Sequence, residues 1–169
     1  MFGKNRGMKQ LLQQYAAYNV WANSRILEAA AKLTEQQLHQ EIVSSFPSVY
    51  KTFVHLMEVE NVWWERLQLV ERPTSPGWFS GSFEELSKRW IALSQQWESW
   101  IQNANEVNIT HVFAYQNTKK EQFKQPVYEM LLHLFNHQTF HRGQLVTMFR
   151  QLGLDKIAPT DFIVFSRKK

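Results

Sequence analysis

The sequence predicts an all-α protein, a four-helix bundle that carries a small β-hairpin between its third and fourth helices. Four segments place apolar side chains at steps of three and four residues, which is the period of an amphipathic helix. Only 6 glycines and 5 prolines occur in 169 residues, and this argues against a turn-rich all-β protein. A chain of this length can bury one core, so we expect residues 1–169 to form a single domain.

The first two long helices follow from their periodicity and from signals at their ends. Apolar residues recur over about residues 8–32, and the Thr-Glu-Gln-Gln of residues 34–37 matches a capping box that predicts a short helix. Ser48 suits the N-cap of the second long helix. We expect that helix to end near Val70, because residues 72–77 contain two prolines and a glycine.

The third long helix is predicted from Ser82 to about Asn103. Ser82 and Glu85 match the N-cap and N3 positions of a capping box. One face of this segment carries a stripe that we assign to the core, made of Leu86, Trp90, Leu93, Trp97 and Trp100.

The pattern changes over residues 106–124, where we expect the hairpin. Residues 107–113 alternate with a period of about two, and Asn117-Thr118 is a turn signal. Residues 121–123 then suit the returning strand.

The fourth long helix should begin at Pro126 and end at Leu152. Proline favours the first turn of a helix, and Gly153 is a natural residue to follow the last one. Beyond it, the Phe-Ile-Val-Phe of residues 162–165 predicts an extended apolar segment that packs on the bundle.

Composition excludes several classes of protein. The sequence has no cysteine, so disulfides, cysteine–zinc sites, iron–sulfur clusters and a protein thiol nucleophile are excluded. No apolar run is long enough to cross a bilayer, and no apolar segment follows the basic residues at the start of the sequence. We therefore expect a cytoplasmic protein without a membrane partner.

The positive net charge of +4 is concentrated at the two ends of the sequence. Residues 10–166 hold thirteen basic residues against fifteen acidic ones, a net charge of −2. A groove for nucleic acid would need its basic residues within the fold, so we expect no nucleic-acid partner. The six basic residues outside that range are Lys4, Arg6, Lys9, Arg167, Lys168 and Lys169.

Three of the six histidines recur at four-residue steps in the last helix, at positions 133, 137 and 141. Residues four apart lie above one another on a helix, so two such imidazoles can reach one cation. His133 and His141 are about 12 Å apart along the axis, which is too far for all three to do so. On a helical wheel the apolar stripe is centred near His141 and close to His137, whereas His133 lies at its edge.

His55, in the second long helix, is the candidate third ligand. Three neutral imidazoles from two helices would form a facial set that leaves positions for water or substrate, as catalytic metal sites do. Each buried imidazole could instead hydrogen-bond a polar group inside the bundle. The other two histidines, His39 and His111, lie in connecting segments and have no role that we can assign.

These residues carry a resemblance to a known family. The run His133-x3-His137-x3-His141-Arg142-Gly143-Gln144 closely resembles the last-helix signature of the DinB/YfiT-like family. Residues 18–23 resemble its first helix, residues 48–64 its second helix, and Asp161-Phe162 its closing segment. The resemblance thus covers nearly the whole sequence.

The resemblance implies a bundle of up-down-down-up topology, a homodimer, and a divalent metal such as Zn, Ni or Fe. Carried over position by position, its three ligands are His55, His137 and His141. Phe140 stands where many members have a further histidine, which is not one of the ligands.

The resemblance implies relatives that use a low-molecular-weight thiol as thiol S-transferases or as a thiol-dependent isomerase. We therefore expect a metal-dependent enzyme of the hydrolase or thiol S-transferase type, acting on a small molecule, with an external low-molecular-weight thiol as a candidate co-substrate. The alternative is a non-catalytic, metal-binding dimer that acts in a stress response. Glu58, Glu60 and Gln144 could orient the imidazoles, or they could be surface or capping residues. If imidazole has its ordinary pKa, metal affinity should fall between about pH 6 and 5.

Overall fold

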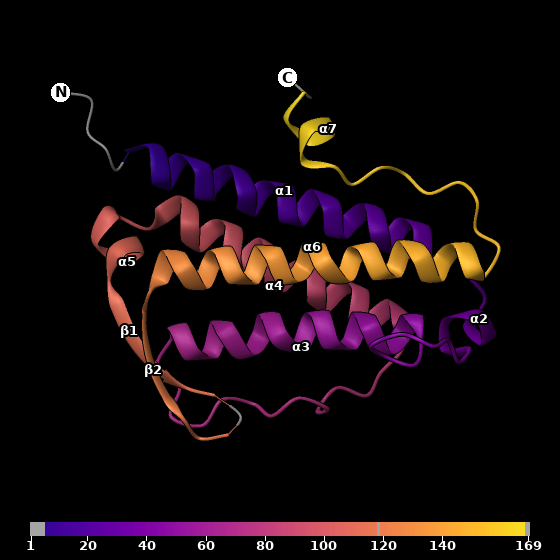
Figure 1. Ribbon diagram of the computed structural model, residues 1–169, viewed down its shortest axis with the longest axis horizontal. Helices are drawn as coiled ribbons and strands as arrows, with labels where there is room; N and C mark the ends of the chain where they lie inside the picture. The colour runs from indigo at the N-terminus through magenta and orange to yellow at the C-terminus, as the bar shows by residue number, and fades with distance from the viewer. Residues whose placement is uncertain (1–5, 118, 168–169) are drawn as a thin grey trace.

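Four long helices form the body of the protein in the computed structural model, which describes residues 6–117 and 119–167 (Figure 1). Helices α1 and α3 each pack against both α4 and α6. In Figure 1, α1 and α6 run in one direction and α3 and α4 run in the other, so the predicted up-down-down-up order is confirmed. The bounds are α1 Arg6–Ala30, α3 Val49–Leu67, α4 Phe83–Asn103 and α6 Val127–Gln151.

Shorter elements connect and cover these helices. Helix α2 (Glu35–His39) lies between α1 and α3 in the sequence. Helix α5 (Glu106–Thr110) follows α4 and leads into an antiparallel hairpin of strands β1 (Val112–Gln116) and β2 (Gln122–Pro126). The helices α3 and α4 are parallel, so the segment that joins them runs back along the bundle (Figure 1). None of the helices in the described ranges is long and apolar enough to cross a membrane.

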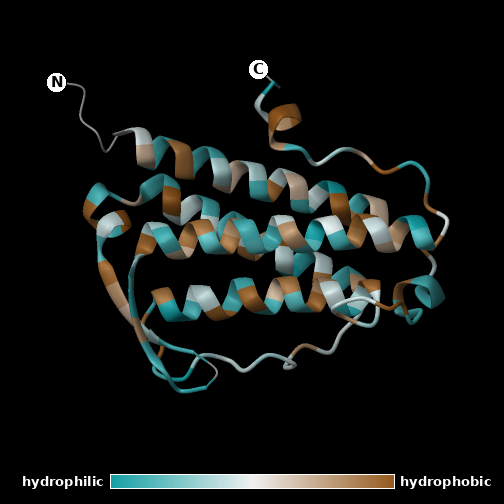
Figure 2. Cartoon of the chain, in the orientation of Figure 1, coloured by the Kyte–Doolittle hydropathy of each residue, from teal (hydrophilic) through white to brown (hydrophobic). Residues whose placement is uncertain are grey.

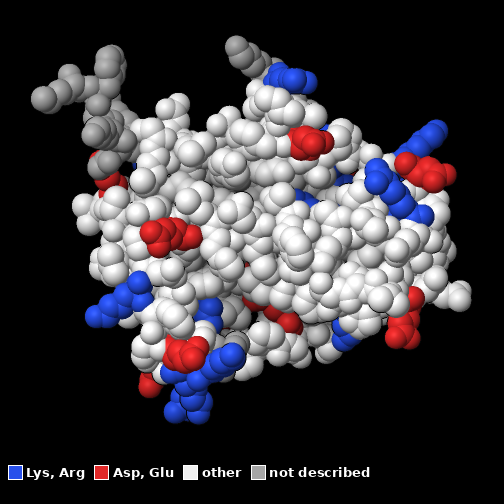
Figure 3. All heavy atoms as spheres, in the orientation of Figure 1, with Lys and Arg blue, Asp and Glu red and all other residues white. Residues whose placement is uncertain are grey.

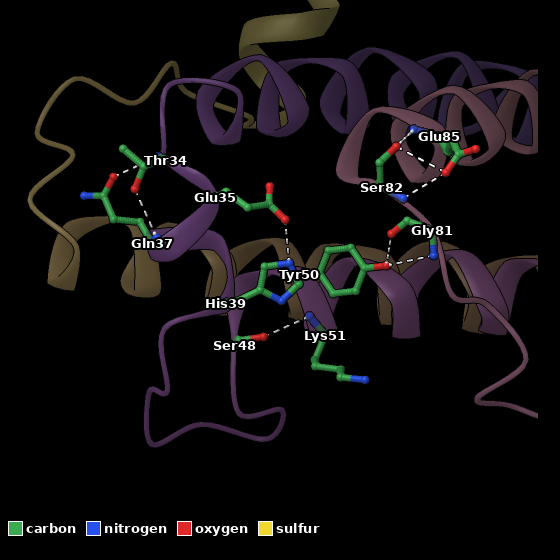
Figure 4. A network of polar contacts seen from close by, with 10 residues as sticks. All are labelled: Thr34, Glu35, Gln37, His39, Ser48, Tyr50, Lys51, Gly81, Ser82 and Glu85. Carbon is green, nitrogen blue, oxygen red and sulfur yellow. Dashed lines mark hydrogen bonds and ion pairs between the residues drawn. The ribbon is translucent and has the colours of Figure 1, made fainter.

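The helix starts predicted at Thr34, Ser48 and Ser82 are confirmed, and they lie at one end of the bundle (Figure 4). The Ser48 side chain accepts a hydrogen bond from the Lys51 N–H, and Thr34 and Ser82 each form a reciprocal capping box. The Tyr50 hydroxyl donates to the carbonyl of Gly81 at 2.6 Å, which ties the start of α3 to the start of α4. These caps satisfy backbone N–H groups that a helix leaves unpaired in its first turn.

The tryptophan stripe of α4 lies in the core, as predicted. Trp90 and Trp97 are fully buried and Trp100 is half-buried. Figure 2 shows hydrophobic and hydrophilic residues mixed along every long helix, as expected for helices that bury one face.

The prediction that residues 107–113 form a strand is wrong. Residues Glu106–Thr110 form helix α5, because Asn105 and Asn108 cap its first turn with reciprocal side-chain hydrogen bonds. The first strand therefore starts at Val112, and the returning strand covers Gln122–Pro126 rather than 121–123. Alternating apolar residues in so short a segment did not distinguish one helical turn from a strand.

The closing segment is also helical rather than extended. Residues Phe162–Ser166 form α7. A helical turn brings Phe162 and Phe165 to one side, where both rings contact Tyr18 of α1 at centroid distances of 5.2 and 5.8 Å. The Tyr18 hydroxyl also donates to the Thr160 carbonyl at 2.7 Å, so the segment is fixed along α1.

A buried polar network joins all four long helices. Arg142 of α6 donates to the side-chain carbonyls of Asn19 and Asn23 on α1, both at 2.7 Å. Asn19 in turn donates to Glu60 of α3 at 3.0 Å, and Ser94 of α4 donates to both oxygens of the same carboxyl. Each of the five side chains is at most 2% exposed. Burial raises the pKa of Glu60 to about 8, against the opposing effect of the Ser94 hydrogen bond.

Helix α3 ends in the same motif as α6, but with a leucine in place of the usual glycine. The N–H of Leu69 bonds to the Arg66 carbonyl and that of Val70 to the Glu65 carbonyl, the two bonds of a Schellman motif. This places Leu69 at φ 56°, in the left-handed region that favours glycine, whereas α6 ends in the same motif with Gly153 at φ 84°.

We expect Leu69→Gly to raise the free energy of unfolding by about 0.5–1 kcal/mol, since glycine adopts the left-handed conformation without steric cost. Gly153→Ala is the matched control and should lower it by about 1 kcal/mol. Urea denaturation measures both. An unchanged or lowered value for Leu69→Gly would contradict the prediction.

Candidate metal centre

The structure brings together the three histidines that the sequence analysis selected. His55 lies near the middle of α3, and His137 and His141 lie on successive turns of the facing helix α6. Each of the three offers one ring nitrogen, and these nitrogens all lie within 4.8 Å of one another. The Nε2 atoms of His55 and His137 are 3.0 Å apart. The three rings therefore converge on one point between two helices.

His133 lies outside this set, as predicted. Its ring centroid is 6.0 Å from that of His137, and its ring packs edge-on against Trp63 at 5.4 Å. His133 is also exposed, whereas His137 is half-buried and His141 is buried. The helical wheel thus identified which two of three equally spaced histidines face α3.

The donor set fits a divalent transition metal. Two imidazole nitrogens that each lie about 2.0–2.1 Å from one ion, in tetrahedral or octahedral arrangement, are separated by about 2.8–3.4 Å. The spacing of the Nε2 atoms of His55 and His137 falls in this range. Imidazole suits Zn, Ni, Fe, Cu and Co, so the ligands alone do not select the ion.

Gln144 fixes the protonation of one ligand. The Nδ1–H of His141 donates to the Oε1 of Gln144 at 2.6 Å, and the Nε2 of Gln144 donates to the hydroxyl of Ser45 at 2.8 Å. Since Nδ1 carries the proton, the lone pair of His141 is on Nε2, which is the nitrogen free to bind a metal. Of the three residues proposed to orient the imidazoles, Gln144 is the one that contacts a ligand.

An aromatic side chain covers one side of the site. Phe46 stacks on the His55 ring at a centroid distance of 4.1 Å and lies 5.7 Å from the His141 ring. Phe140 is exposed, and its ring lies 5.0 Å from that of His141. Neither Ser45 nor Phe46 was identified from the sequence, because both lie in a connecting segment with no periodic pattern.

The environment keeps the imidazoles neutral. Burial, and after it the neighbouring His141, lower the pKa of His55 to about 4. Burial also lowers the pKa of His137 to about 3, with added effects of the other histidines around it. The pKa of His141 is lowered by burial, against the opposing hydrogen bond to Gln144. Neutral imidazole is the form that binds a metal, so the site is prepared for one at neutral pH.

Comparisons with known proteins agree with this fold and identify the family. The sequence matches the model of the DinB family over residues 5–167. The chain belongs to the DinB family. It is 32% identical to protein DinB of Bacillus subtilis (strain 168) over 154 residues, which cover 86% of this chain and 87% of that protein.

Solved structures of DinB-like proteins share the fold. A DinB-like protein from Bacillus cereus ATCC 10987 is 20% identical, with a TM-score of 0.68 over 94% of this chain and 99% of that one. The DinB-like protein YjoA of B. subtilis is 11% identical, with a TM-score of 0.66 over 88% of this chain and 98% of that one.

Two other candidate residues of this DinB-family chain serve the fold instead. Glu58 and Glu60 were expected to orient imidazoles or to lie at the surface, and both are buried. The Glu58 carboxylate accepts hydrogen bonds from the N–H groups of Gly77 and Phe79, so it holds the segment between α3 and α4 against the bundle. Glu60 belongs to the network around Arg142. The hydrogen bonds that these two carboxyls make are thus to groups other than the imidazoles.

The lowered pKa values predict how stability depends on pH. Above about pH 6.5 the imidazoles are neutral in both the folded and the unfolded protein. Below that pH, the imidazoles of the unfolded chain become protonated while those of the folded site stay neutral, so protonation favours the unfolded chain. Between pH 7 and 5, the metal-free protein should therefore lose about 2 kcal/mol of unfolding free energy, a value halved because the rings are partly exposed. Urea denaturation at several pH values measures the loss.

The control for this prediction is the exposed His111. His111→Ala should keep the pH dependence, and His137→Ala should reduce it. An equal pH dependence in both variants would contradict the prediction.

The same pKa values, about 4 and 3, place the competition between protons and metal for the folded site below pH 5. This is lower than the window of about pH 6 to 5 that ordinary imidazole predicts.

Proposed function

We propose that this DinB-family protein binds one divalent transition metal through His55, His137 and His141 and uses it in a thiol-dependent transfer reaction on a small molecule. The observation that carries the proposal is the convergence of three neutral imidazoles from two helices on one point. Three protein ligands leave coordination positions free, which is typical of catalytic rather than structural sites.

A divalent cation held there would lower the pKa of a thiol that it contacts, and so supply a thiolate at neutral pH. The sequence has no cysteine, so the thiol would come from outside the protein. Phe46 would shield one side of the centre from water, and Gln144 would keep the His141 lone pair on Nε2. The thiolate sulfur would then form a bond to an electrophilic carbon as the leaving group departs, and the thiol proton would pass to solvent.

Turnover with a chlorinated or epoxide probe and a panel of low-molecular-weight thiols tests the proposal. Chelator-treated protein without a histidine tag is reloaded with Zn, Ni or Fe, and the thioether product is followed by mass. We expect turnover that needs both metal and thiol, that is lost in His141→Ala, and that is retained in His133→Ala.

Gln144→Leu adds a graded test, because removing a group that orients a ligand typically lowers metal affinity or activity about 10- to 100-fold. Metal binding without turnover on any probe would overturn the enzymatic part and favour the non-catalytic metal-binding dimer. Consumption of the probe without thiol would indicate a hydrolase instead.

A further inference from the structure

A cavity lies away from the three histidines, at the C-terminal end of α3. It has a volume of about 700 Å³ and lies between the end of α3, the start of the segment that leads to α4, and the β1–β2 hairpin. Arg66, which lines it, follows His55 by eleven residues, or about 16 Å along the helix axis. The cavity is therefore separate from the candidate metal centre.

Arg66 is held in place by aromatic rings rather than by an acidic partner. Its guanidinium carbon lies 4.6 Å from the Trp63 ring centroid and 5.3 Å from that of Tyr115. Its Nε is buried and has no hydrogen-bond partner within residues 6–117 and 119–167. The other two guanidinium nitrogens are not among the buried unpaired atoms and make no hydrogen bond or ion pair with another described residue, so they are open to a group that enters the cavity.

The acidic residue nearest in sequence does not neutralise Arg66. Both oxygens of Glu65 accept hydrogen bonds from Thr74, and one also accepts from Asn61. The cavity lining itself contains Arg66, Arg72 and Lys120 against a single acidic residue, Glu71. Figure 3 shows blue Lys and Arg atoms, with some red ones among them, at the lower left, where Figure 1 places the hairpin. An excess of positive charge thus surrounds the free donor.

The rest of the lining mixes apolar residues with uncharged polar ones, and two of its residues have a positive φ. Val62, Leu69 and Tyr115 contribute apolar surface. Leu69 and Lys120 have φ of 56° and 64°, and within the described part of the chain they are the non-glycine residues with positive φ. Both line this cavity.

We propose that this cavity binds a small organic carboxylate, with Arg66 donating to the carboxylate and the apolar lining holding the body of the molecule. The planar guanidinium offers paired donors that match the two oxygens of a carboxylate. Trp63 and Tyr115 fix its orientation in advance, so little side-chain entropy is lost on binding. The proposal does not depend on a metal at the three histidines.

Calorimetric titration of the chelator-treated full chain with benzoate tests it, with benzamide as the neutral analogue of the same shape. We expect one benzoate per chain at millimolar concentration and at least about tenfold weaker binding of benzamide. Arg66→Met should weaken benzoate binding by about ten- to a hundredfold. His55→Ala should leave it unchanged, which separates this site from the metal centre.

Arg89→Met is the matched control, because Arg89 also lies over two rings, those of Trp78 and Phe79, but lines no part of this cavity. It should bind benzoate as the unaltered protein does. The Nε–H signal of Arg66 in the unaltered protein gives a second readout by NMR, independent of whether the variant folds. It should shift with benzoate and not with benzamide.

Three results would overturn the proposal. They are equal binding of benzamide and benzoate, no effect of benzoate on the Arg66 Nε–H signal, and an equal loss of affinity in Arg66→Met and Arg89→Met. Tighter binding of phenyl phosphate than of benzoate, with the same dependence on Arg66, would overturn the assignment to carboxylates.

Discussion

Replacing His137 by alanine is expected to weaken the binding of Zn²⁺ or Ni²⁺ by more than about a hundredfold, a greater loss than removal of an orienting residue produces. His137 is central to the set: its Nε2 faces that of His55 at 3.0 Å, and its ring centroid lies 4.5 Å from that of His141. Without it, two ligands remain on different helices. Competition with a chromophoric chelator, on protein without a histidine tag, measures the affinity.

His133→Ala is the matched control, since it removes an imidazole one turn away on the same helix. It should leave the affinity within about threefold, because His133 packs against Trp63 and lies outside the converging set. A large loss in His133→Ala together with an unchanged affinity in His137→Ala would show that α6 presents another face to the metal.

Arg142→Met is expected to lower the free energy of unfolding by about 2–6 kcal/mol, because two buried acceptors lose their donor at a cost of about 1–3 kcal/mol each. Methionine keeps much of the volume but leaves the side-chain carbonyls of Asn19 and Asn23 without their 2.7 Å donors. Loss of the Arg142 charge also removes one of the effects that oppose the raised pKa of Glu60. Urea denaturation at pH 7 gives the difference.

Arg150→Met, at an exposed position of the same helix, should change the unfolding free energy by less than about 0.5 kcal/mol. Similar changes in the unfolding free energy for the two variants would contradict the view that the Arg142 network holds the four helices together.

The histidine set could be predicted from the sequence because it depends on short-range helix geometry. The four-residue spacing places His137 and His141 on one face, and the apolar stripe of the same helix shows where that face points. Gln144, also named as a candidate, lies three residues after His141 on the same helix, which places it within reach of that ring. His55 needed the further assumption that its helix faces the last one, and α3 and α6 do pack together.

Features that depend on contacts between distant segments were not predictable in this way. Phe46 reaches His55 from a segment without periodicity. Arg66 and Tyr115 meet because the hairpin folds against the end of α3, and the sequence placed the first strand five residues too early. Glu58 and Glu60 lie near His55 in sequence, but the helix turns them toward other partners.

Metal-edge anomalous diffraction from crystals of protein purified without a tag or added metal tests the central claim most directly. We predict a single peak per chain, about 2.0–2.2 Å from the Nε2 atoms of His55, His137 and His141. A peak that excludes any of these three, a peak on His133, or no peak after the crystals are soaked in Zn²⁺ or Ni²⁺ would contradict it.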